Sequence, residues 1–161
     1  MVYAKKSTSA AAILLSTMAG SISATAWASP GAGITPENLV TADFEETAVI
    51  NNDRVKIQTK DRTDVRVQRL TFGAGAYSGW HHHPGVVIVA VASGSVTLMD
   101  ANCGSKTYGP GQANGGVFIE GHVAAQQAVS ADGATVYVTY VAPSAEPRVF
   151  RVEDPVPFCA Q

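Results

Sequence analysis

The chain has 161 residues, with 11 lysines and arginines against 13 acids, a formal net charge of −2 at pH 7 and 46% hydrophobic residues. That length favours a single folded domain. Because the chain has no basic run or stripe, nucleic acid is excluded as an expected partner. Outside the N-terminal segment, no stretch is long and apolar enough to form a membrane-spanning helix.

Residues 1–28 have the pattern of a secretory signal peptide. Lys5 and Lys6 give a basic start, residues 10–23 form a small apolar run, and an Ala-Trp-Ala cleavage signal ends at Ala28. The alternative is a membrane anchor, but the run is too short and too rich in serine and threonine to span a bilayer, which takes about 20 apolar residues. We therefore expect an exported protein, periplasmic or secreted.

Residues 29–41 are rich in proline, glycine and threonine, so we expect a flexible N-terminal arm, followed by one domain over residues 42–161. Alternating apolar and polar residues then predict β-strands, and no segment keeps a helical period. Many short strands separated by glycine-containing turns indicate an all-β sandwich or barrel. The expected strands lie at residues 54–59, 64–72, 86–92, 95–99, 117–119, 122–129, 134–141 and 148–152.

The chain has two cysteines, Cys103 and Cys159. A small, even number of cysteines in an exported protein favours a disulfide, which would tie the last residues back onto the domain. The alternative is a pair of free thiols, which fits an oxidising compartment less well.

Three of the four histidines fall in the stretch GWHHHPG at residues 79–85. On a strand, His81 and His83 point to one face while His82 points to the other. Two convergent imidazoles can hold a metal ion at about 2.0–2.1 Å if at least one further ligand joins them. His122 is the only other histidine and could come from a neighbouring strand. The alternative is a polar turn with partly exposed imidazoles.

The spacing of Gly75, His81, His83 and Gly94 resembles the first motif of the cupin superfamily, G-(x)5-H-x-H-(x)3–4-E-(x)6-G. The phrases GWHHHPG, CGSKTYGPGQ, EGHVAAQ and VYVTYVAPSAEP further resemble small exported single-domain cupins, which also tend to carry a cysteine pair placed like this one. The resemblance covers about residues 65–159. It implies a double-stranded β-helix (jelly-roll) barrel with a small-molecule site inside its mouth. Since cupins commonly pair through strand edges, a structural or oligomerising role as a homodimer is a third possibility beside the two functions given below.

The sequence departs from the cupin pattern at two ligand positions. Val87 stands where the first motif has its glutamate. When Gly121 is aligned with the glycine of the second motif, Ala124 and Ala128 stand where the family has its histidine and asparagine. On this alignment, two of the four usual metal ligands have no counterpart.

Three residues near the second motif are candidates to complete the site. His122 is the likeliest third metal ligand beside the two motif histidines, and three-histidine sites without the glutamate are known in the family. Gln126 lies on the same strand face and offers an amide oxygen, which is a weak ligand for such metals. Glu120 could orient the imidazole of His122, although a lone acid in a loop is more often solvated.

Two functions remain open at this point. The first is a metal-binding cupin of oxidoreductase or dioxygenase type, with Fe, Mn, Ni, Cu or Zn. The alternative is a metal-free, non-catalytic barrel that binds a small ligand. Arg66 and Arg69 face opposite sides of one strand, so at most one points inward, where it could hold a substrate carboxylate. The pattern alone favours two solvated arginines.

Overall fold

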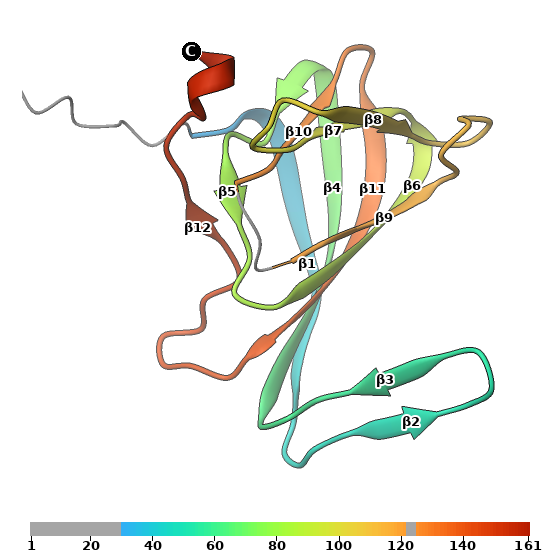
Figure 1. Cartoon of the computed structure of the whole chain (residues 1–161), viewed down its shortest axis with the longest axis vertical. Coiled ribbons are helices and arrows are strands. Elements are labelled where there is room, and N and C mark those ends of the chain that lie inside the picture. The colour runs from blue at the N-terminus through green and yellow to red at the C-terminus, as the bar shows by residue number, and fades with distance from the viewer. Residues whose placement is uncertain (1–29, 122–124) are drawn as a thin grey trace, which may run out of the picture.

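The computed structural model describes residues 30–121 and 125–161, and these form an antiparallel β structure (Figure 1). The predicted signal peptide therefore lies outside the described residues. The elements are β1 (Ala32–Phe44), β2 (Val49–Asn51), β3 (Lys56–Gln58), β4 (Thr63–Tyr77), β5 (His81–His82), β6 (Val86–Gly94), β7 (Val96–Met99), β8 (Ser105–Tyr108), β9 (Val117–Glu120), β10 (Gln127–Ser130), β11 (Ala134–Pro143), β12 (Val152–Glu153) and the 3₁₀-helix η1 (Phe158–Ala160).

The main sheet has the strand order β8-β7-β10-β4-β11-β6-β9 and curls into a nearly closed barrel (Figure 1). The long strand β4 pairs with β1 along one edge, and with β11 and then β10 along the other. Two short pairs, β5 with β12 and β2 with β3, stand outside this sheet. The predicted all-β jelly-roll barrel is confirmed.

The barrel interior follows from the period-two pattern that the sequence predicts. Along β6, Val87, Val89 and Val91 are buried while Val86 and Ile88 are exposed, because successive side chains of a strand point to opposite faces. The other strands of the sheet add buried side chains to the same core, among them Phe72, Val96, Phe118, Ala128, Val136 and Val138.

The expected N-terminal arm over residues 29–41 requires correction, because residues 32–41 belong to strand β1, which pairs with β4. The sheet therefore begins about ten residues before the expected domain boundary at 42. Pro36 is compatible with this strand because β1 has a partner on one edge only, so the missing backbone N–H need not face a neighbour. Two register shifts in the pairing absorb the irregularity near Gly33 and Leu39.

The C-terminal segment, residues 148–161, returns across the barrel and is attached there. Its strand β12 pairs with β5 (Figure 1), and the predicted disulfide between Cys103 and Cys159 is present. Cys103 lies in the connection between β7 and β8, so the bond joins η1 to the barrel wall. Among residues 30–121 and 125–161, no helix has the length and hydrophobicity that a membrane crossing requires.

Candidate metal centre

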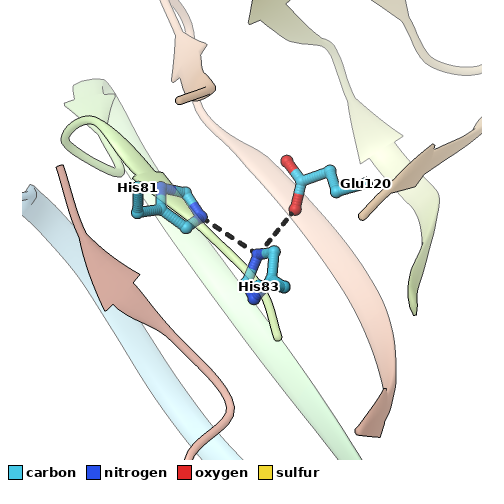
Figure 2. Close-up of side chains that lie close together, drawn as sticks. All are labelled: His81, His83 and Glu120. Carbon is cyan, nitrogen blue, oxygen red and sulfur yellow. Dashed lines mark hydrogen bonds and ion pairs between the residues drawn. The ribbon is translucent and has the colours of Figure 1, made fainter. Parts of the chain in front are cut away.

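Two of the three adjacent histidines point into the barrel, as the alternation predicts. His81 and His83 are 4% and 3% exposed, and their Nε2 atoms lie 3.1 Å apart (Figure 2). His82 faces the other way, and its Nδ1 lies 2.8 Å from Oδ2 of Asp154. The strand thus directs two imidazoles into the cavity, and the third contacts Asp154 outside it.

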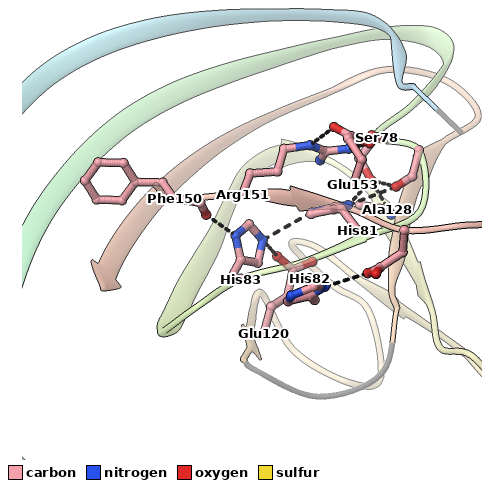
Figure 3. A network of polar contacts seen from close by, with 11 residues as sticks. Ser78, His81, His82, His83, Glu120, Ala128, Phe150, Arg151 and Glu153 are labelled. Atoms are coloured by element: carbon pink, nitrogen blue, oxygen red, sulfur yellow. Dashed lines mark hydrogen bonds and ion pairs between the residues drawn. The ribbon is translucent and has the colours of Figure 1, made fainter. Parts of the chain in front are cut away.

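Backbone carbonyl groups fix the orientation of both inward rings. His81 Nδ1 lies 2.9 Å from the Gly79 carbonyl oxygen, and His83 Nδ1 lies 2.6 Å from that of Phe150 (Figure 3). Because a carbonyl oxygen only accepts hydrogen bonds, each Nδ1 carries the proton and donates it. In the neutral rings, each Nε2 is therefore an unprotonated nitrogen that points toward the other ring. Metal-binding histidines in proteins are usually held in this way.

A carboxylate completes the cluster. Glu120 ends strand β9, is 5% exposed, and places Oε2 3.0 Å from His83 Nε2 (Figure 2). Glu120 lies directly opposite Val87 in the pairing of β6 with β9. Directly opposite residues share a face of the sheet. The carboxylate of Glu120 therefore lies on the neighbouring strand, beside the position where the cupin motif has its glutamate.

The three groups form an arrangement suited to a cation. One ligand atom from each of His81, His83 and Glu120 lies within 4.8 Å of the others. Ligand atoms about 2.1 Å from one ion and 90° apart lie roughly 3.0 Å from each other, which matches the two short separations. With both rings neutral, three electron-pair donors converge without a proton between them. A cation, or a proton on His83 Nε2, relieves that repulsion.

The electrostatics of the cavity keep His81 ready for metal binding. Burial lowers the pKa of His81 to about 4, and the positive charge of Arg151 acts in the same direction. At neutral pH its Nε2 therefore has a free electron pair. A metal ion does not have to displace a proton from this nitrogen above about pH 4.

The C-terminal segment forms hydrogen bonds with residues 78–83, the histidine strand (Figure 3). Asp154 N–H donates to the Trp80 carbonyl at 2.9 Å, next to the contact between His82 and Asp154. Arg151 donates to the Ser78 carbonyl at 2.6 Å. Together with the Phe150 carbonyl, these contacts hold the histidine strand along its length. The histidines thus depend on residues about 70 positions later in the chain.

A cavity of about 470 Å³ opens beside the three candidate ligands. Its polar lining includes the cluster and the side chains of Arg66, Tyr140 and Arg151, and its other walls are mostly the apolar inward residues of β4, β6, β9 and β11. That volume is in the range of small-molecule sites in proteins, which run from about 300 to 1,000 Å³. The cavity can hold a small organic molecule in contact with the cluster.

The structure places the sequence-predicted site residues in three different situations. His81 and His83 come together, whereas His122 lies outside the described residues and stays a prediction as a ligand. The backbone of Gln126 forms two hydrogen bonds with the backbone of His81, and Gln126 lines a separate cavity of about 310 Å³. Glu120, expected to orient His122, is a candidate ligand instead. Its inward position after Phe118 in an apolar strand was the available signal.

No family model matches the sequence, and no curated protein matches it. Among solved structures, a conserved protein of unknown function from Streptococcus pyogenes is 16% identical, with a TM-score of 0.44 over 63% of this chain and 78% of that chain. A cupin-2 domain protein from Rhodospirillum rubrum is 12% identical, with a TM-score of 0.47 over 71% and 63%. An oxalate oxidase, solved with the substrate analogue glycolate, is 16% identical, with a TM-score of 0.43 over 55% and 45%, so the chain spans less than half of that protein's length. All three TM-scores are below 0.5, so these similarities say nothing about the activity of this chain.

The residues of the cupin-like motif occupy defined places in the barrel. The barrel carries the two motif histidines inside, and both motif glycines, Gly75 and Gly94, have positive φ angles of 73° and 71°. At Gly94 a Cβ atom would also lie 2.1 Å from the Gly133 carbonyl oxygen, so the position requires glycine. The protein is a jelly-roll β barrel that carries the two histidines of its cupin-like motif inside, and its candidate carboxylate ligand comes from β9.

Proposed function

We propose that the protein binds a divalent metal ion through His81, His83 and Glu120 and uses it on a small molecule in the barrel cavity. The reaction class that we propose is an oxidation of the dioxygenase type. The supporting observation is the convergence of three buried ligand atoms, with both imidazoles already oriented by backbone carbonyls. Two histidines and one carboxylate form the ligand set of many non-haem Fe(II) oxygenases and of some zinc enzymes.

The residues around the cluster suit this role. When bound, the metal would supply Lewis-acid or redox chemistry at the coordination positions that three protein ligands leave open. The apolar part of the cavity wall would limit the water that reaches these positions once a molecule fills the cavity. Burial raises the pKa of Tyr140 to about 12, so its phenol stays protonated at neutral pH. Its ring centroid lies 5.5 Å from that of His83, where the hydroxyl can donate a hydrogen bond to a molecule in the cavity.

We also propose that the protein is exported and acts in the periplasm or the medium. The disulfide supports this proposal, because such bonds persist mainly in oxidising compartments. N-terminal sequencing of the exported protein tests the assignment, with a first residue of Ser29 expected. A mature chain that keeps residues 1–28, or a cytoplasmic protein, would contradict it.

The test of the metal site is the metal content of the mature protein, purified without chelator and without an affinity histidine tag. We expect one equivalent of metal after loading with Fe, Mn, Ni, Cu or Zn, and none in the double variant His81→Ala/His83→Ala. For the Fe(II) protein, an electron paramagnetic resonance signal on addition of nitric oxide would report an open coordination position.

The matched control is His82→Gln, which changes the histidine between the two ligands but faces away from the cavity. We expect this variant to keep the full equivalent of metal. If the wild type binds none of the five metals, the metal proposal fails and the alternative of a metal-free, ligand-binding barrel takes its place.

A further inference from the structure

Four residues on four adjacent strands form one row across the inside of the barrel. Arg66 on β4 lies opposite Tyr140 on β11, Tyr140 lies opposite Val87 on β6, and Val87 lies opposite Glu120 on β9. Because directly opposite residues share a face, the row carries a guanidinium at one end and a candidate metal ligand at the other. Three strand spacings of about 4.8 Å separate the two ends by roughly 14 Å along the sheet at most.

The guanidinium of Arg66 lacks an anionic partner within residues 30–121 and 125–161. Its Nε is buried and has no hydrogen-bond acceptor there, and its Cζ lies 4.0 Å from the centre of the Phe150 ring. Arg69, three residues along the same strand, points outward and forms an ion pair with Glu37. The stacking orients Arg66 but does not neutralise its charge.

The other arginine of the cavity is already neutralised. Arg151 donates from Nε and Nη2 to the two carboxylate oxygens of Glu153, at 2.6 and 2.9 Å, and also donates to the backbone at Ser78. A bidentate pair of this kind satisfies both charges. Arg66 is therefore the side chain that gives the cavity its uncompensated positive charge.

The charge and shape of the cavity together define what fits it. A divalent ion on the single carboxylate of Glu120, together with Arg66, leaves the cavity positively charged, which an anionic group on a bound molecule would offset. Below the polar row the walls become mostly apolar, because Val138, Val89 and Phe118 follow the polar Gln68 in the second row. A planar guanidinium matches a carboxylate, which it can bind through two hydrogen bonds.

We propose that Arg66 binds the carboxylate of the substrate, and that the site takes small organic acids with an apolar body whose other end reaches His81, His83 and Glu120. This inference rests on the proposed function, since it names the substrate class of the same cavity. It makes Arg66 a specificity-determining residue that contacts the substrate.

The test compares three acids with their neutral amides: acetate with acetamide, hexanoate with hexanamide, and benzoate with benzamide. Each pair is titrated calorimetrically into Zn(II)-loaded protein, because Zn(II) is redox-inert and prevents turnover. We expect at least one acid to bind ten times or more tighter than its amide. Arg66→Gln should lose that preference, whereas the matched control Arg69→Gln, on the opposite face, should keep it.

The same samples separate this inference from the metal proposal. If all proteins bind one zinc but no acid is preferred, or if Arg66→Gln keeps the preference, the role of Arg66 is overturned and the metal site stands. If the wild type binds no zinc, the titrations on the metal-free protein still decide whether Arg66 selects acids, and loading with Fe, Mn, Ni and Cu decides the metal proposal separately. If Arg66→Gln does not fold, Arg66→Lys replaces it. Lysine keeps the charge above Phe150 without the planar fork, so a reduced preference is expected and an unchanged one counts against the proposal.

Discussion

The two ends of the barrel interior are built by the same strands and yet do different things. At one end, inward positions carry Ala76, Val91 and Ala134, which pack into the core. At the other end, inward positions of the same sheet carry Arg66 and Glu120 and face a cavity. Strand alternation is identical at both ends. The type of residue at the inward positions therefore determines whether they pack into the core or form a binding site. Changes at the apolar end should therefore alter stability, and changes at the polar end should alter binding.

The largest expected effect comes from truncating Phe118, a core side chain that also forms part of the cavity wall. It is 5% exposed and packs against the Tyr108 ring at a centroid distance of 4.9 Å. Phe118→Ala should lower the free energy of unfolding by about 3–5 kcal/mol, because it leaves a cavity in the core. Urea unfolding of the metal-free protein measures the loss. Glu120→Gln, two residues along the same strand face, is the matched control and should lose metal binding with a stability change of about 1 kcal/mol or less. Equal destabilisation by both changes would remove the distinction between packing residues and binding residues.

Removing the disulfide should affect both ends at once. Cys103→Ser/Cys159→Ser should lower stability by up to about 4 kcal/mol, the chain-entropy value for a loop of this length. It should also weaken metal binding, since the released segment carries the Phe150 carbonyl that orients His83. Urea unfolding and zinc titration measure the two effects. A reducing agent should reproduce them in the wild type and leave the double variant unchanged.

The pH dependence of stability should report the polar end. The pKa of His81 is lowered by burial from 6.5 to about 4 in the folded protein, so between these values the unfolded chain binds more protons. The stability of the metal-free protein should therefore fall as pH drops from 6.5 to 4, by up to about 3 kcal/mol. Urea midpoints with chelator present measure this, and His81→Asn isolates the contribution. If the slope is the same in both proteins, the predicted shift is wrong.

The smallest expected effect is a change in metal affinity when the carboxylate moves across the pair of strands. Glu120→Val should weaken zinc binding by about 100-fold or more through the loss of one ligand. Val87→Glu/Glu120→Val places a carboxylate at the opposite position of the same row and should recover affinity to within about tenfold of the wild type. If the double variant binds no better than Glu120→Val, position 87 cannot serve the site.

The sequence was sufficient for the barrel and for two of the three candidate ligands. His81 and His83 share a strand face whatever that strand pairs with, so alternation alone brings them together. Glu120 could not be placed in this way, because its position depends on the register between β6 and β9, which lie far apart in the sequence. The sequence shows that Glu120 is an acid in an apolar strand, but it does not predict that this acid lies beside His83.

Strand β1 was missed for a related reason. Proline and glycine in residues 29–41 lower the local preference for a strand, and local preference was the only information available. In the folded protein, β4 offers 15 residues of strand edge, and β1 pairs along most of it. Pairing between distant segments thus overrides local composition.

The support of the histidines by residues 150–154 also sets the order of events during synthesis. When the histidine strand has been made, the Phe150 carbonyl and the Asp154 side chain that hold it do not yet exist. A nascent chain therefore carries the two ligands without their final orientation, and a well-formed site appears only when the end of the chain is available. The place where the chain is completed and folds then determines which metal ions it meets first.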